Sequence, residues 1–137
     1  MSKETYREYL KSSHWKNLKK VAKSKTRNRR CGVCWAFDVP LDFHHISYNK
    51  DLSKVSPDQI RTVCRDCHNA IHVAKDTGLI DLSKTKSTNG RWVLMQRGAR
   101  EVRGLTKEKL AIAKQAYTKE VYIRDSSTPS QHSVLVP

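Results

Sequence analysis

The chain has 137 residues, of which 37% are hydrophobic, so it can form one compact domain with a modest apolar core. It has no apolar run of membrane-spanning length and no secretory-signal core near Met1, so we expect a cytoplasmic protein that binds no membrane. The net charge of +14 fits a solvated basic surface as well as a polyanionic partner, and it leaves the oligomeric state open.

The charge is unevenly distributed. Residues 1–30 carry eleven Lys and Arg against two acids, residues 31–80 five against six, and residues 81–137 eleven against five. The middle segment, close to neutral, also holds all four cysteines and four of the six histidines. This pattern favours a reactive site on a phosphate polyanion that flanking cationic segments hold by charge.

Two short helices are predicted at the N-terminus, over residues 3–11 and 14–24, with Ser2 and Ser13 as N-caps. One face of the second helix is apolar, and its residues are Trp15, Leu18 and Val21 with Ala22. The lysines off that face are Lys16, Lys19, Lys20 and Lys23. This helix should therefore dock by one side and present cations on the other.

The cysteine-containing segment predicts two short strands. A knuckle at Cys31 is followed by a strand over residues 42–46, a loop over 47–58 and a strand over Ile60–Val63. From there a helix is expected to begin with Asp66 as N-cap and to stop at Gly78.

The C-terminal part predicts a loop over residues 83–90, a strand over 91–96 and a helix over 106–121. The apolar side of that helix comprises Leu110, Ala113, Tyr117 and Val121. We therefore divide the chain into a basic helical arm (1–30), a core (31–78), a basic strand and helix extension (79–125) and a disordered tail (126–137).

The four cysteines form two CxxC pairs, Cys31 with Cys34 and Cys64 with Cys67, separated by 29 residues. Each pair can form a knuckle on one tetrahedral Zn²⁺, and a reducing cytosol favours zinc over disulfides or free thiols. The separation exceeds the spacing of about 15–20 residues in ordinary zinc ribbons, so another site is expected between the pairs.

Four histidines accompany this cysteine frame. His44 and His45 are neighbours on the first predicted strand, so their side chains should point to opposite faces and have different roles. His68 and His72 are four residues apart on the predicted helix, so both imidazoles should point the same way. A second structural zinc is the main alternative for this set, whereas His14 and His132 are interpreted as ordinary histidines.

Together these residues resemble the HNH, or ββα-metal (His-Me finger), nuclease motif in the zinc-knuckle version common among free-standing phage and bacterial endonucleases. The matching run is Cys31-x-x-Cys34, His44-His45-Ile46 and Gln59-Ile60-x-x-Val63-Cys64-x-x-Cys67-His68-x-x-x-His72, within residues 13–75. The resemblance implies a small α+β fold, with a ββα-metal core stapled by a four-cysteine zinc and flanked by helices.

The resemblance also implies residue roles. His44, His68 and His72 match ligands of a catalytic divalent ion, which could be Mg²⁺, Mn²⁺, Ni²⁺ or Zn²⁺, and His45 matches the general base, facing a water. The family chemistry is phosphodiester hydrolysis that leaves 5′-phosphate and 3′-hydroxyl ends. An imidazole with an ordinary pKa of about 6.5 suits proton abstraction from water near neutral pH.

Gln59 departs from the family pattern, because the middle residue of the motif is normally Asn. The amide is kept but one methylene is added, which puts full activity in doubt. Gln59 also fits a capping box with Ser56 as N-cap and Pro57 as the first residue. One amide could serve both purposes, and Asn49 and Asn69 are less well placed substitutes.

The expected partner is DNA, in double-stranded form. Phosphate contacts are predicted for Lys16, Lys19, Lys20, Lys23, Arg27, Arg29 and Arg30. Arg61 and Arg65 are candidates for steadying the scissile phosphate. Trp15, Trp35 and Trp92 are interpreted as core residues. The alternative function is a non-catalytic, zinc-dependent nucleic-acid-binding module, which Gln59 and the high charge would both allow.

Overall fold

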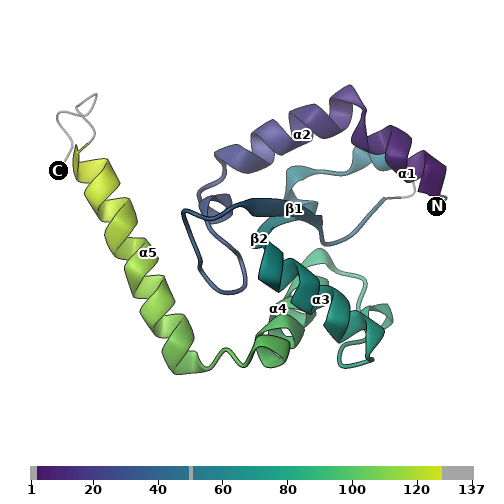
Figure 1. Ribbon diagram of the computed structural model, residues 1–137. Coiled ribbons are helices and arrows are strands. Elements are labelled where there is room, and N and C mark those ends of the chain that lie inside the picture. Colours follow the sequence, from purple (N-terminus) through teal and green to yellow (C-terminus); the bar gives the residue numbers. More distant parts are fainter. Residues whose placement is uncertain (1–2, 50, 128–137) are drawn as a thin grey trace.

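A computed structural model describes residues 3–49 and 51–127 of the chain (Figure 1). The sheet consists of β1 (Leu41–His45) and β2 (Ile60–Cys64). The helices are α1 (Lys3–Leu10), α2 (Ser13–Ser24), α3 (Arg65–Asp76), α4 (Thr88–Arg103) and α5 (Lys107–Ser127). The predicted small α+β class is confirmed.

The two strands pair antiparallel in a register that sets Leu41 opposite Cys64 and His45 opposite Ile60. Because side chains alternate along a strand, one face of β1 looks toward α1 and α2, and the other looks toward α3. Figure 1 shows α1 and α2 on one side of the strands and α3 with α4 on the other. The sheet therefore separates two groups of functional side chains.

A hydrophobic core lies on each side of the sheet. On the α3 side, Ile71 of α3 and Met95 of α4 pack with the cysteines and with Val63 of β2. On the α2 side, Trp15 and Leu18 pack with Ile60. Both strands are thus sandwiched between helices, which fixes the direction of each side chain that they carry.

The N-terminal helices are close to the predicted ones. Trp15, Leu18 and Ala22 of α2 are buried as expected, whereas Val21 is 45% exposed and lies off the docking face. The N-cap of α2 is Ser12 and not Ser13, because the Ser12 hydroxyl accepts the Trp15 amide at 3.1 Å. The predicted cap at Ser2 lies outside the described residues.

The predicted N-cap of α3 was also wrong. Cys64 is the N-cap and Asp66 lies inside the first turn, so the second CxxC pair overlaps the start of the helix. Gly78 follows the C-cap Thr77 with a φ of 78°, a left-handed conformation that favours glycine, in agreement with the predicted stop.

The strand predicted over residues 91–96 is wrong, because these residues lie in α4. Trp92, Met95 and Ala99 are buried at helical spacing, and tertiary packing outweighs the β-propensity of the aromatic and branched residues. A Cβ on Gly98 would lie 2.8 Å from the Cβ of Ala74, so α4 packs closer to α3 at this point than a residue with a side chain would permit. The regular secondary structure of the extension is therefore helical, with no strand among its described residues.

The remaining segments differ modestly from expectation. The loop over residues 47–58 contains two 3₁₀ turns, η2 (Leu52–Lys54) and the first residues of η3 (Pro57–Gln59). Residues 126 and 127 of the predicted tail belong to α5, and residues 128–137 lie outside the described residues. Among the described residues, no helix combines the length and apolarity needed to cross a membrane.

Candidate zinc site and catalytic site

The two CxxC pairs come together between the knuckle before β1 and the junction of β2 with α3. The four Sγ atoms of Cys31, Cys34, Cys64 and Cys67 lie within 4.8 Å of one another, and those of Cys34 and Cys64 are 3.7 Å apart. Zn–S bonds of 2.3 Å in a tetrahedron give S–S separations of about 3.8 Å. A disulfide needs about 2.05 Å, and all four thiols are free.

The knuckle backbone supports this arrangement. The amides of Val33 and Cys34 point at Sγ of Cys31, at 3.4 and 3.5 Å, as donors to a thiolate would. Gly32 is needed here, because a Cβ at this position would lie 2.6 Å from the indole of Trp92. The donor set and its geometry therefore fit a structural zinc ion.

Sequence reasoning missed a cation beside these sulfurs. Arg103, near the end of α4, donates to Sγ of Cys67 at 3.1 Å. Four thiolates around a divalent cation carry a net negative charge, so a guanidinium at this distance stabilises the bound form. Only the packing of α4 on α3 could reveal this pair, because 36 residues separate its members.

Three histidines form a second cluster on the α3 side of β1. One nitrogen from each of His44, His68 and His72 lies within 4.8 Å of the others. His44 belongs to β1, and the other two lie one turn apart on α3, as the i, i+4 spacing predicted. The predicted grouping of these three imidazoles is confirmed.

His44 shows most clearly that the cluster fits a cation. The side chain is 7% exposed, and its Nε2 has no hydrogen-bond partner among the described residues. Burial, together with neighbouring His68 and His72, lowers the pKa of His44 to about 3, so the ring is neutral and has a lone pair to donate. A buried acceptor without a partner is costly, and a cation would relieve that cost.

Asp42 orients His68, a role that the sequence analysis did not identify. Its Oδ2 lies 3.0 Å from Nδ1 of His68, and its Oδ1 accepts from Arg65 at 3.1 Å. This contact fixes the orientation of the ring and leaves Nε2 of His68 for a cation. The sequence did contain a signal for this role of Asp42, because Asp42 and His44 are two residues apart and therefore share one strand face.

Replacing Asp42 with asparagine should weaken cation binding at the histidine cluster by about 10–100-fold, because the amide no longer supplies a carboxylate to His68. Titration calorimetry with Ni²⁺ on zinc-loaded protein measures the change. Asp58→Asn is the matched control, since that exposed carboxylate only makes a 3.5 Å ion pair with Arg27. Equal Ni²⁺ affinities for the two variants would contradict the orienting role.

His45 faces the opposite side of β1, as strand alternation predicted. Its ring stacks between Trp15 and Tyr48, with centroid separations of 4.6 and 4.7 Å, and its Nε2 lies 3.2 Å from the Tyr9 hydroxyl. The side chain is 5% exposed. The expectation that this ring faces a water is therefore not met in this conformation.

Burial determines the protonation states of His45 and Tyr9. It lowers the pKa of His45 to about 4, and burial with the neighbouring Tyr6 raises the pKa of Tyr9 to about 12. Both side chains are thus uncharged near neutral pH, and they share one hydrogen bond. Sequence reasoning missed Tyr9, which lies 36 residues away and meets His45 only through the docking of α1.

Stability should fall as the pH drops from about 6.5 toward 4. Over this range the unfolded chain protonates His45 while the folded chain does not, so acid favours unfolding, by about 2 kcal/mol at pH 5. We expect this loss to be absent from His45→Gln, in urea unfolding followed from pH 7 to pH 5. Every other histidine is the same in wild type and His45→Gln, so its contribution cancels in the comparison. Parallel plots of unfolding free energy against pH for the two proteins would contradict the prediction.

Gln59 forms the predicted capping box with Ser56, and its side chain also hydrogen-bonds to the segment after His45. Its Oε1 accepts the Ser56 amide at 2.9 Å, completing the capping box. Its Nε2 donates to Ser47 Oγ at 3.0 Å and to Asn49 Oδ1 at 2.8 Å. The Gln59 side chain therefore links Ser47 and Asn49 in the segment that follows β1. A catalytic role for Gln59 remains a prediction.

The predicted arginines occupy different environments. Arg65 is exposed beside Asp42 at the histidine cluster, and Arg61 donates to the backbone oxygen of Asp58. The Arg30 guanidinium lies over the Trp35 ring, 3.3 Å from its centroid, so it is engaged in packing. Arg27 is ion-paired and Arg29 is exposed. Arg65 is therefore the best-placed arginine for contact with a phosphate at the histidine cluster.

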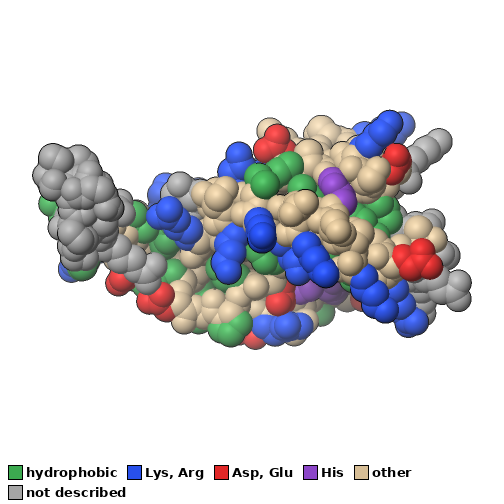
Figure 2. All heavy atoms as spheres, turned by 90° about the horizontal axis from the view of Figure 1, so that it is seen from above, with side chains coloured by type: hydrophobic (Ala, Val, Ile, Leu, Met, Phe, Trp, Pro, Cys, Tyr) green, Lys and Arg blue, Asp and Glu red, His purple; other side chains and the backbone are tan. Residues whose placement is uncertain are grey.

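The four lysines of α2 are gathered on one surface. Together with Phe43 of β1 they line an open groove of about 400 Å³, and its residues are Lys16, Lys19, Lys20, Lys23 and Phe43. Figure 2, seen from above Figure 1, shows several Lys and Arg side chains on the face that includes α2. The predicted cationic face of this helix is confirmed as an arrangement, and its contact with phosphates remains a proposal.

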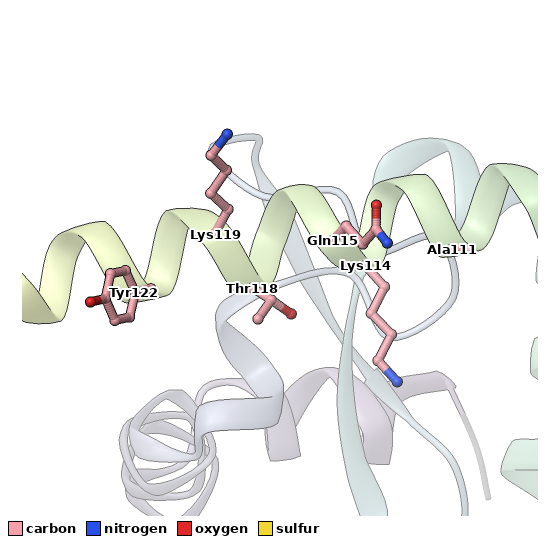
Figure 3. Close-up of a pocket in the computed structure, with 6 residues that line it drawn as sticks. All are labelled: Ala111, Lys114, Gln115, Thr118, Lys119 and Tyr122. Atoms are coloured by element: carbon pink, nitrogen blue, oxygen red, sulfur yellow. The ribbon is translucent and has the colours of Figure 1, made fainter.

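A larger pocket of about 560 Å³ lies along α5, far in sequence from the histidines. Its lining residues all belong to that one helix and are Ala111, Lys114, Gln115, Thr118, Lys119 and Tyr122 (Figure 3). It contains no histidine, cysteine or carboxylate, so we assign the reactive chemistry to the histidine cluster and not to this pocket.

A comparison with protein families agrees with this geometry. Residues 31–74 match a family model described as HNH endonuclease, and the match contains both CxxC pairs and all four histidines of the frame. This segment of the chain thus matches an HNH endonuclease domain, its clustered cysteines are consistent with a zinc knuckle, and the match indicates a nuclease or other nucleic-acid-related function. Searches of curated proteins and of solved structures gave no match.

Proposed function

We propose that this protein is a metal-dependent endonuclease that hydrolyses phosphodiester bonds in DNA. The observation that carries the proposal is the cluster of His44, His68 and His72 inside the segment that matches the HNH family, where the buried Nε2 of His44 has no partner among the described residues. Three neutral imidazoles hold a cation without cancelling its charge, which suits work on an anionic substrate.

In this proposal His44, His68 and His72 hold one divalent cation. Bound there, it would supply Lewis-acid stabilisation of the charge that develops on the phosphodiester. Asp42 keeps His68 in the required tautomer, and Arg65, ion-paired with the same carboxylate, can turn to a phosphate oxygen. The cysteine zinc holds β2 and α3 in the relative position that brings the three rings together.

His45 is the proposed general base, a role that rests on the family motif. Its low pKa keeps the ring neutral and able to accept a proton from water. The Tyr9 hydroxyl occupies Nε2 in the described conformation, so proton transfer requires that water replace this hydroxyl, through movement of the segment that carries Tyr9. The catalytic conformation would then differ from the described one at α1.

The test is cleavage of supercoiled plasmid by zinc-loaded protein with Mg²⁺, Mn²⁺, Ni²⁺ or additional Zn²⁺. Wild-type protein is expected to nick or linearise the plasmid with at least one of these ions. His45→Ala and His45→Gln should both cut about 10²–10⁴-fold more slowly, since general-base catalysis contributes that much. An inactive wild type with every ion, or unchanged cutting by both variants, would refute the catalytic proposal.

A second candidate function is a zinc-dependent nucleic-acid-binding module without catalysis. The enclosure of His45 by Trp15, Tyr48 and Tyr9 favours it, because a base that water cannot reach does no chemistry. Such a module needs only the cysteine zinc, whereas a nuclease should take up a second ion. Metal analysis after dialysis against each ion therefore distinguishes the two functions.

A further inference from the structure

The groove beside α2 combines charge with a partly exposed aromatic side chain. Lys16, Lys19, Lys20 and Lys23 recur at helical spacing, so they form one stripe, about 10 Å long from first to last. None of the four belongs to an ion pair within the described part of the chain, and no acidic residue lines the groove. This stripe can therefore hold several phosphates of a polyanion.

Phe43 completes the lining of this groove. It is partly exposed and contacts the buried Trp15 edge-on, with ring centroids 6.5 Å apart, so Trp15 holds the Phe43 ring in place. Lys19 also lies over the Trp15 ring, 5.6 Å from its centroid. An aromatic ring beside lysines that form no ion pair among the described residues is the combination that holds single-stranded nucleic acid, where bases stack and phosphates pair with cations.

The position of Phe43 also relates the groove to His45, the proposed general base. Phe43 and His45 are two residues apart on the same face of β1, a distance of about 6.6 Å along the strand. That distance equals about two nucleotide steps of a stacked strand. The groove and the enclosed ring of His45 therefore lie on the same side of the sheet.

We propose that this groove binds an unpaired nucleobase, which stacks on Phe43 while the lysines hold the flanking phosphates. This inference rests on the proposed function for its biological meaning: the substrate of the nuclease is DNA with an unpaired nucleotide next to the cleaved bond, as in single strands or locally opened duplexes. The binding itself does not depend on hydrolysis.

The experiment measures binding by fluorescence anisotropy on zinc-loaded protein, with an oligothymidylate of about twelve nucleotides. The comparison probes are the same strand with abasic sites at its centre and a duplex of equal length. Wild-type protein should prefer the base-bearing single strand to both. Phe43→Leu should lose about 5- to 150-fold in affinity for oligothymidylate and nothing for the abasic strand, because stacking contributes about 1–3 kcal/mol per base.

Three further variants make the result specific. Phe43→Trp should keep the preference for bases, and Phe37→Leu, a matched aromatic change outside the groove, should bind like wild type. Lys20→Gln should weaken all probes and reduce the salt dependence, since it removes a phosphate contact. Far-UV circular dichroism checks the fold of each variant, and a gel checks that the probes stay intact.

Equal affinity of wild-type protein for base-bearing and abasic strands would overturn the proposal, and this comparison needs no folded variant. Unchanged oligothymidylate binding by folded Phe43→Leu would overturn it as well. Failure of the nuclease proposal looks different: base-dependent binding persists while plasmid cutting is absent. Active cutting with no effect of Phe43 on binding would refute the groove assignment alone.

Discussion

Replacing Cys67 with serine is expected to abolish the cooperative folding of the HNH domain. Cys67 is fully buried and belongs to both the sulfur cluster and the core on the α3 side of the sheet. Structural zinc contributes about 10–16 kcal/mol in small zinc-finger domains, which matches or exceeds the total stability of about 5–15 kcal/mol of a typical domain. A single-ligand loss should therefore remove most of the native structure.

Zinc content and thermal unfolding measure this effect. The variant should hold well under one zinc ion per chain and unfold without a sharp transition, and a strong chelator should do the same to wild-type protein. Restoring zinc to chelator-treated wild type is the control, and it should recover the transition. A Cys67→Ser protein with a wild-type melting curve would show that the cysteine cluster is dispensable for the fold.

Replacing His72 with alanine should slow DNA cleavage by about 10³-fold or more while leaving the fold intact. His72 is exposed on α3, so its truncation creates no cavity, but it removes one of three imidazoles for the second ion. A catalytic cation contributes several kcal/mol of transition-state stabilisation, and each 1.36 kcal/mol is a factor of ten in rate.

The readouts are plasmid cleavage, metal content and thermal stability measured side by side. His72→Ala should keep its cysteine zinc and its melting temperature, lose the second ion and lose cutting. His14→Ala is the matched control, because that histidine contacts the Val55 carbonyl and lies outside the cluster. Full cutting by His72→Ala would remove this imidazole from the mechanism.

The hydrogen bond between Tyr9 and His45 can be removed without altering the histidine cluster. Tyr9→Phe should remove the hydrogen-bond partner of Nε2 and keep the aromatic packing around the His45 ring. The three-histidine cluster and the environment of His45 are on opposite faces of β1, so effects on metal content and on the base can be separated by variant. This separation follows from strand alternation alone.

Features with a local signal could be predicted from the sequence. The CxxC spacing, the i, i+4 histidines of α3 and the alternation of His44 with His45 each follow from backbone geometry over a few residues, and each is borne out. Capping of η3 by Gln59 was predictable for the same reason, since cap and partner lie three residues apart.

Contacts between segments that are distant in the sequence could not be predicted in this way, because they depend on how the elements pack. Residues 91–96 became part of a helix because Trp92 and Met95 pack against α3, and no local propensity reports that packing. Tyr9 reaches His45, and Arg103 reaches Cys67, across 36 residues in each case. Local rules fix which face a side chain takes, whereas the environment it meets there depends on which other elements fold against that face.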